Sequence, residues 1–221
     1  MSVPEIGKSK QRRDGLREAQ RRFTRQHILD AAIDVFLERG YIISTVEDII
    51  ERAGTSRRTF YAHFRSKADV LVEAGARLIP EIQEHYRALD EALLDGSWEA
   101  LRDWFAASID WRARHGALVS VWEEAATVEP AQQTNSRQVI EGFPDLMPHY
   151  LARWPRDRER EARLRIVLLN LQVAGYYNHT PPRDMDAHAR ALAADVFANM
   201  WYHALRAPSG DPSQRSSERL G

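Results

Sequence analysis

The sequence predicts an all-α protein in which a small helix-turn-helix domain precedes a larger helical domain. Along the chain, apolar residues recur at i, i+3, i+4 and i+7, the spacing of amphipathic helices. Glycines and prolines fall between these segments, where helices end. Residues 44–67 (STVEDIIERAGTSRRTFYAHFRSK) also have the layout of a helix-turn-helix, with a helix, a tight turn and a second short helix. In total we expect about nine helices.

The first helix of the DNA-binding domain is expected to run from Thr24, as its N-cap, to Arg39. Ser44 and Glu47 have the spacing of a capping box at the start of the next helix. Gly54 is expected to end that helix, because glycine readily adopts the left-handed conformation that a sharp turn requires. These signals place two helices before the tight turn of the motif.

The short helix after the turn, over about residues 56–61, has a basic N-terminal turn. It carries Arg57, Arg58 and a threonine, side chains that suit contacts with phosphates and guanine. Ser66 is expected to cap a further helix, and Lys67 in its first turn opposes the helix dipole at a cost of about 0.3 kcal/mol. Because a phosphate bound there would remove this conflict, Lys67 is a predicted phosphate contact.

The segment Ala53–Lys67 contains the pattern AG-x-S-x-x-T-F-Y-x-x-F-x-S-K and resembles the DNA-binding domain of tetracycline-repressor-type (TetR/AcrR) regulators. The preceding segment Ile28–Tyr41 fits the same family pattern, and the close resemblance covers residues 24–72. In this motif Arg57 and Arg58 are expected to contact bases, with plain solvation as the alternative. The predicted DNA-contacting residues are Thr45, Ser56, Arg57, Arg58, Thr59, Tyr61, His63 and Lys67.

The remaining side chains of this motif have different expected roles. Phe60 and Phe64 are expected to be core residues that lock the second helix, whereas Tyr61 and His63 are expected to contact the DNA backbone. A single copy of such a module has little specificity. Two copies held by a dimer are expected to bind a palindromic operator in double-stranded DNA, with half-sites about one helical turn apart or a little more.

The composition excludes several classes of protein. The chain has 221 residues, enough for one large domain or two small ones, and it contains no cysteine, which excludes disulfides, thiolate catalysis and cysteine-based zinc sites. No apolar run approaches about 18 residues, and the basic N-terminus lacks the apolar stretch of a signal peptide. We therefore expect a cytoplasmic protein with no membrane partner.

Charge is distributed unevenly and supports a division into domains. Residues 1–67 carry 14 Lys and Arg against 9 Asp and Glu, whereas the remainder carries 17 against 23. A basic N-terminal third is typical of a nucleic-acid-binding module. We expect a basic flexible arm over 1–22, whose arginines either contact DNA or form a solubilising tail. The other expected parts are the helix-turn-helix domain over 23–69, a ligand-binding and dimerisation domain over 70–206, and a disordered tail over 207–221.

The C-terminal domain is expected to be helical throughout. The helix that begins at Ser66 reaches Ile82, and Pro80 within it either ends the helix or kinks it. The other expected helices are 97–114, 117–128 after Gly116, an interrupted region over 134–154, then 157–177 and 186–206. The last two have broad apolar surfaces and look like the dimer-forming pair of the family, with an ordinary intrachain core as the alternative.

Five of the six tryptophans lie between Trp98 and Trp154 and are candidates for an effector pocket. The predicted ligand-binding residues are Trp104, Phe105, Ser108, Trp122, Phe143, Met147, Tyr150 and Asn170. A packed aromatic core is the alternative for each aromatic residue, and Asn170 either binds the ligand or a neighbouring backbone carbonyl. Glu123 and Glu124 are expected to face solvent. Such a pocket favours a small-molecule effector that is apolar or aromatic.

No motif indicates catalysis, a metal site or a cofactor. The eight histidines are scattered without paired metal-ligand spacing, and phosphate-binding and nucleophile motifs do not occur. The sequence therefore predicts a homodimeric repressor, not an enzyme, which an effector releases from its operator by moving the helix that begins at Ser66. Two alternatives stay open. One is a DNA-binding regulator without an effector, and the other is an all-α ligand carrier or enzyme with an incidental helix-turn-helix.

Overall fold

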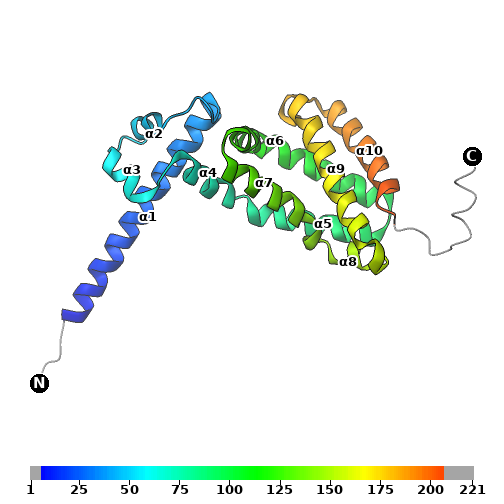
Figure 1. The fold of residues 1–221 in the computed structure, drawn as a ribbon, viewed down its shortest axis with the longest axis horizontal. Coiled ribbons are helices and arrows are strands. Elements are labelled where there is room, and N and C mark those ends of the chain that lie inside the picture. The colour runs from blue at the N-terminus through cyan, green and yellow to red at the C-terminus, as the bar shows by residue number, and fades with distance from the viewer. Residues whose placement is uncertain (1–5, 207–221) are drawn as a thin grey trace, which may run out of the picture. The chain divides into compact units, whose positions relative to one another are not determined.

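The computed structural model describes the backbone of residues 6–206 and the side chains of residues 15–206. Within this range it contains ten α-helices, three short 3-10 helices and no strand, which confirms the all-α prediction (Figure 1). The α-helices are α1 (Ile6–Arg39), α2 (Val46–Arg52), α3 (Arg57–His63), α4 (Lys67–Ala76), α5 (Ile79–Asp95), α6 (Trp98–Val128), α7 (Pro130–Gly142), α8 (Pro148–Ala152), α9 (Glu159–His179) and α10 (Ala187–Ala204).

The described chain forms two compact units. The first unit contains the chain up to Ile79 together with Ala117–Thr134, and the second contains Pro80–Gly116 and the residues from Asn135 onward. This division differs from the boundary predicted between residues 69 and 70. The reason is burial: Leu71 and Ala74 of α4 are fully buried in the core of the first unit, and so is Ala125 of α6.

Helix α1 begins at Ile6, much earlier than the predicted start at Thr24. Thr24 is not an N-cap, because its Oγ1 donates a hydrogen bond to the Gln20 carbonyl one turn earlier within the helix (3.0 Å). Residues 6–22, expected as a flexible arm, are helical, in keeping with their helix-favouring Arg, Gln, Glu and Ala residues. Residues 1–5 and the predicted tail over 207–221 lie outside the described backbone.

The helix-turn-helix forms where the sequence predicted it, with one correction at its start. Thr45, not Ser44, is the N-cap of α2 and forms a capping box with Asp48. Ser44 is buried, and its hydroxyl donates to the carbonyl of Gly40. Gly54 has φ +55°, which confirms the left-handed turn.

Proline and glycine affect the later helices differently. Helix α4 ends at Ala76 and α5 begins at Ile79, so Pro80 lies in the first turn of a new helix, where it is tolerated. By contrast, α6 runs continuously through Gly116, and the prediction of two helices there is wrong. One half-buried glycine costs only about 1 kcal/mol relative to alanine, too little to interrupt a helix that continues for several turns on both sides of it.

The region before α9 is interrupted as predicted, although its first helix, α7, begins at Pro130 and not at residue 134. Helix α7 ends at Gly142, the 3-10 helix η1 covers Phe143–Leu146, and α8 begins at Pro148. The buried carboxylate of Asp90 on α5 accepts hydrogen bonds from the backbone N–H groups of His149 and Tyr150 (3.0 and 2.7 Å), which satisfies the start of α8. In the described part of the chain, no helix is both long and apolar enough to cross a membrane.

Candidate nucleic-acid interface and effector site

The predicted DNA-contacting side chains all belong to the first unit. Most lie on α3, whereas Thr45 and Ser56 directly precede α2 and α3 and Lys67 is the first residue of α4. Ser56 caps α3 by accepting a hydrogen bond from the Thr59 amide (3.1 Å), which sets the direction of the helix start. Arg57 and Arg58 in this first turn are exposed. Phe60 and Phe64 are buried, which confirms that they are core residues.

Arg57 forms an ion pair with Glu47 of α2 across the turn (2.7 Å). Both side chains are more than half exposed. An exposed pair of this kind contributes about 1 kcal/mol or less. The contact therefore orients Arg57 without preventing it from exchanging Glu47 for a phosphate or a base.

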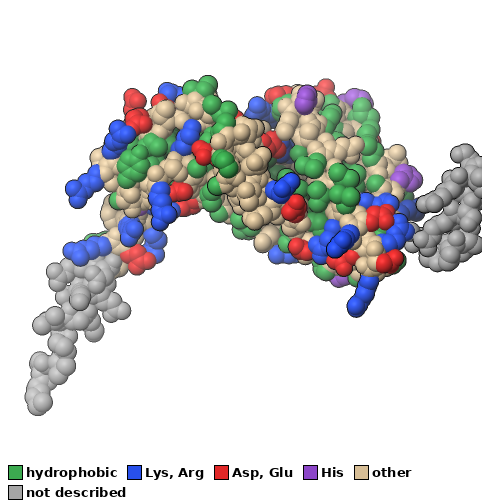
Figure 2. All heavy atoms as spheres, viewed as in Figure 1, with side chains coloured by type: hydrophobic (Ala, Val, Ile, Leu, Met, Phe, Trp, Pro, Cys, Tyr) green, Lys and Arg blue, Asp and Glu red, His purple; other side chains and the backbone are tan. Residues whose placement is uncertain are grey.

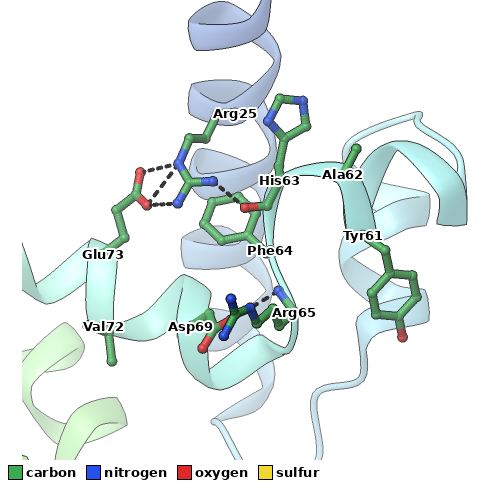
Figure 3. Close-up of a pocket in the computed structure, with 9 residues that line it drawn as sticks. All are labelled: Arg25, Tyr61, Ala62, His63, Phe64, Arg65, Asp69, Val72 and Glu73. Atoms are coloured by element: carbon green, nitrogen blue, oxygen red, sulfur yellow. Dashed lines mark hydrogen bonds and ion pairs between the residues drawn. The ribbon is translucent and has the colours of Figure 1, made fainter.

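The C-terminal end of α3 is fixed by Arg25, for which the sequence predicted no structural role. Arg25 of α1 donates to the carbonyl of His63 and to the carboxylate of Glu73 on α4, as Figure 3 shows. Its guanidinium also lies 4.1 Å from the centre of the Phe64 ring. One side chain thus connects α1, α3 and α4.

Lys67 has partners that the sequence did not reveal. Its ammonium group donates to the carbonyls of Tyr41 and Ser44 (2.7 and 2.8 Å) and lies 4.2 Å from the centre of the Tyr41 ring. Burial lowers the pKa of Lys67, although Glu129 and Glu124 oppose that shift. In the free protein Lys67 therefore holds the loop before α2, and its phosphate contact stays a prediction.

His63 lies beside a hollow that Arg25, Tyr61, Arg65 and Asp69 help to line (Figure 3). Its Nδ1 is buried and has no hydrogen-bond partner among the described residues. Burial lowers the pKa of His63, and the positive charges of Arg21 and Arg25 lower it further. Both effects favour the neutral form of the His63 ring in the free protein.

The segment 117–134 contributes contacts to the first unit that sequence reasoning missed. The carboxylate of Glu124, expected to face solvent, accepts hydrogen bonds from the backbone N–H groups of Tyr41 and Ile42 (2.8 and 3.1 Å). Glu129 accepts from the Tyr41 hydroxyl (3.0 Å), and burial together with this contact raises the tyrosine pKa. The loop that enters the helix-turn-helix is therefore held by residues more than 80 positions away.

Trp122, a predicted ligand residue, also belongs to the first unit. Its ring lies directly against Gly75 of α4, where an added Cβ would come within 1.2 Å of the ring. Only glycine permits this approach without displacing the ring. The structure therefore does not group Trp122 with the other predicted effector residues, all of which lie in the second unit.

The remaining predicted effector residues are largely packed in the core of the second unit. Trp104, Phe105, Met147 and Tyr150 are buried, whereas Ser108, Phe143 and Asn170 are half-buried.

Asn170 already has partners on both sides of its amide group. Its Oδ1 accepts from the hydroxyl of Tyr86, and its Nδ2 donates to the Ile166 carbonyl (2.8 Å). The Tyr86 ring stacks on Phe143 with centroids 4.2 Å apart. The backbone alternative for Asn170 is thus present in the described chain, and its ligand contact stays a prediction.

Three hydrogen-bond donors in the same core lack an acceptor within the described residues. They are the Tyr177 hydroxyl and the indole N–H groups of Trp154 and Trp201. Buried polar groups are normally paired, so each unpaired donor requires an explanation. The sequence predicted none of these unpaired donors. Tyr177 and Trp201 lie on helices expected only to have broad apolar surfaces, and Trp154 was one of the clustered tryptophans.

Helices α9 and α10 present rows of apolar side chains to solvent. Leu164, Leu168 and Leu171 are exposed at i, i+4 and i+7 of α9, at fractions between 48 and 55%. On α10, Leu192, Val196 and Met200 follow at steps of four, with fractions between 40 and 56%. Apolar side chains gather on the second unit in Figure 2. Exposed apolar rows are typical of surfaces that bind another protein.

The left-handed glycine turn, the capped α3 and its exposed arginines define a helix-turn-helix DNA-binding protein. A sequence model described as "Bacterial regulatory proteins, tetR family" matches residues 28–74. The regulator TcmR of Streptomyces glaucescens is 30% identical over 190 residues, which cover 85% of this chain and 77% of TcmR. The chain belongs to the TetR family and is a DNA-binding transcription regulator.

Two further relatives support this assignment. The regulator AlkX of Mycobacterium tuberculosis is 24% identical over 192 residues, which cover 86% of this chain and 91% of AlkX. The transcriptional repressor DhaR of Mycobacterium sp. (strain GP1) is 34% identical over 99 residues, which cover 43% of this chain and 48% of DhaR. The similarity to TcmR and AlkX thus extends well beyond the helix-turn-helix.

Proposed function

We propose that this protein is a homodimeric repressor that a small-molecule effector releases from a palindromic operator. The observation that carries the proposal is the exposed arginine pair at the start of a capped, well-anchored α3. The relatives support it, because they include regulators and a repressor. Such a regulator would act in the cytoplasm, where it meets its operator.

In this proposal α3 enters the major groove and Arg57 and Arg58 bind guanine edges. Each bidentate contact of this kind discriminates against a wrong base by about 1–3 kcal/mol. Thr59 contacts a thymine methyl group or a phosphate. Tyr61 and His63 contact the backbone, as do Thr45 and Ser56 at the two helix starts.

The dimer is proposed to form through the exposed apolar rows of α9 and α10. Two copies of this helix pair would pack as a four-helix bundle and remove both rows from water. A two-fold axis there would pair the α3 helices with two half-sites about 34–36 Å apart or slightly more.

The effector is proposed to bind in the aromatic core of the second unit. Stacked rings, such as Tyr86 on Phe143, favour a mostly apolar or aromatic molecule. The unpaired donors of Tyr177 and Trp201 add a requirement for acceptor oxygens, such as carbonyl, ether or carboxylate groups. An effector that carries both features would pair these donors when it binds.

Effector binding is proposed to act on DNA affinity through α6. This helix is continuous from Trp98 to Val128, so its N-terminal half belongs to the second unit and its C-terminal part to the first. Its last turns carry Glu124, which holds the loop before α2. Since α4 and α5 are separate helices, a movement of α6 is a more direct route than the swing of one long helix beginning at Ser66. A difference of about 1–3 kcal/mol between the effector's binding free energies for the DNA-binding state and the released state would suffice for this regulation.

The experiment is a binding titration with the DNA upstream of the protein's own gene and a scrambled duplex, at two salt concentrations. Selective binding that is lost in the double variant Arg57→Ala/Arg58→Ala, with the dimer intact, supports the proposal. Equal, strongly salt-dependent binding to both duplexes favours the carrier alternative. Selective binding that no apolar, acceptor-bearing compound weakens favours a regulator without an effector.

A further inference from the structure

The N-terminal part of α1 extends beyond the core of the first unit. The first buried residue of the helix in the described chain is Ile28. Every residue from Gly15 to Phe23 is exposed, although the helix continues through them without interruption. Figure 1 shows α1 continuing past α2 and α3 toward the N-terminus. A helix of this kind is maintained without packing support, so its surface is available to a partner.

The exposed part of α1 carries a row of arginines that starts at the recognition helix. Arg17, Arg21 and Arg25 are spaced by four residues, so they follow one side of α1 at steps of about 6 Å. Arg25 binds the carbonyl of His63, the last residue of α3. Arg21 is near enough for its charge to act on the His63 ring. The row therefore lies on the side of α1 that faces the end of α3.

The charge of this segment is strongly positive. Residues 6–25 carry eight Lys and Arg against two acidic residues, Asp14 and Glu18. Glu18 pairs weakly with Arg22, outside the row (3.4 Å), and Glu73 of α4 binds Arg25 at the inner end of the row. Basic side chains are visible along the described part of the extension (Figure 2). A rigid basic row beside a DNA-recognition helix is complementary to the phosphate backbone of a duplex.

We infer that the exposed N-terminal turns of α1 form a second DNA-contacting surface, which binds the phosphate backbone flanking the half-site without reading its sequence. This inference rests on the proposed function. A duplex held by α3 would have its backbone near Tyr61 and His63, and the row from Arg25 to Arg17 continues from there. Because the turns are already helical, binding needs less ordering than a flexible arm would.

The test compares two operator duplexes, one trimmed to the half-sites and one with about 10 additional base pairs on each side, roughly one helical turn. The wild-type protein should bind the long duplex more tightly. The variant Arg17→Ala/Arg21→Ala should lose about 10-fold affinity for the long duplex. Its salt slope, which is the steepness with which log affinity falls as log salt concentration rises, should decrease by about 1.8 per protomer, because two phosphate contacts are removed. Its affinity for the trimmed duplex should stay unchanged.

A matched control removes the same charge elsewhere. Arg156→Ala/Arg160→Ala takes two exposed arginines from the second unit and should change neither affinity nor salt slope. A second variant, Ala19→Pro, keeps every arginine but interrupts the helix and should also lose the gain from flanking DNA. Retention of that gain by Ala19→Pro would refute the role of the helix. Retention by Arg17→Ala/Arg21→Ala would refute the surface itself.

The exposed apolar residues Leu16 and Phe23 make a protein partner the competing occupant. If the extension served self-association, Arg17→Ala/Arg21→Ala would alter the oligomeric state measured by light scattering and would still bind the long duplex more tightly than the trimmed one. That result would overturn the inference. Failure of the proposed function is distinguishable, because it would appear as a lack of selective binding by the wild-type protein. Even then, the salt slope on an unrelated duplex should be lower for the variant.

Discussion

Glu124 provides a direct test of how the first unit is held together. Its two carboxylate oxygens each accept one backbone N–H, from Tyr41 and Ile42. The approach depends on Gly40, which has φ +79° and where a Cβ would come within 2.9 Å of the carboxylate. Glu124→Gln has nearly the same shape but only one accepting oxygen, and its NH₂ group would point at a backbone donor. The substitution therefore removes one hydrogen bond and the charge that strengthens the other.

The expected cost can be estimated from these contacts. Hydrogen bonds to charged groups contribute about 1.5–3 kcal/mol and neutral ones about 0.5–1.5 kcal/mol. Ile42 is exposed, so water can partly replace the lost acceptor and reduce the penalty. We therefore expect Glu124→Gln to weaken the attachment of this loop by about 2 kcal/mol, which corresponds to a factor of about 30 in a local opening equilibrium.

The assay is amide hydrogen exchange at Tyr41 and Ile42, with urea unfolding as a second measurement. In Glu124→Gln, protection of these amides should fall by about 30-fold. The control is Glu91→Gln, which removes the same charge from an exposed position on α5 and should leave both amides unchanged. If both amides of Glu124→Gln exchanged at the wild-type rate, the carboxylate would not be what holds the loop.

Three further predictions concern packing and pH. Gly75→Ala should destabilise the protein by about 1–3 kcal/mol in urea unfolding, because the added methyl group meets the Trp122 ring. Adding Trp122→Ala should recover part of that loss, and strictly additive effects of the two substitutions would contradict the contact between these residues. Asp90→Ala should cost about 2–4 kcal/mol, because it leaves the buried amide of Tyr150 and the partly buried amide of His149 unpaired. A change below 0.5 kcal/mol would show that water replaces the carboxylate. Burial lowers the pKa of His85 to about 4, so the unfolded chain binds a proton more readily than the folded chain does. The free energy of unfolding should therefore fall as the pH drops from about 6.5 to 4. His85→Gln should flatten this part of the stability profile, and an unchanged slope would assign the pH dependence to other groups.

Most of the helix-turn-helix was predictable because its signals are local. Ser56 and Ser66 cap the helices that they precede, and Gly54 forms the turn. The one-residue error at Ser44 has a simple cause. Both Ser44 and Thr45 have an acidic residue three positions later, so spacing cannot choose between them, and the burial of Ser44 decides.

The contacts of the segment 117–134 could not be predicted, because they join residues far apart in sequence. Glu124 and Tyr41 are separated by 83 positions, and nothing near either residue identifies the other. The same holds for Trp122 and Gly75, since a tryptophan in an aromatic-rich helix fits a ligand pocket as well as it fits a glycine surface. Gly116 failed as a helix end because local composition shows the cost of a glycine but not the support of the surrounding helix.

These long-range contacts restrict how an effector could change DNA affinity. A ligand shifts an equilibrium only by the difference between its affinities for the two states. Filling the aromatic core of the second unit therefore has no regulatory consequence unless the preferred state also differs in the first unit. Because Glu124 lies on a helix that both units share and binds the loop leading into α2, the difference that matters is whether its carboxylate reaches Tyr41 and Ile42. Under this hypothesis, Glu124→Gln should mimic part of the effector's action and lower operator affinity while also reducing the further loss that an effector can cause.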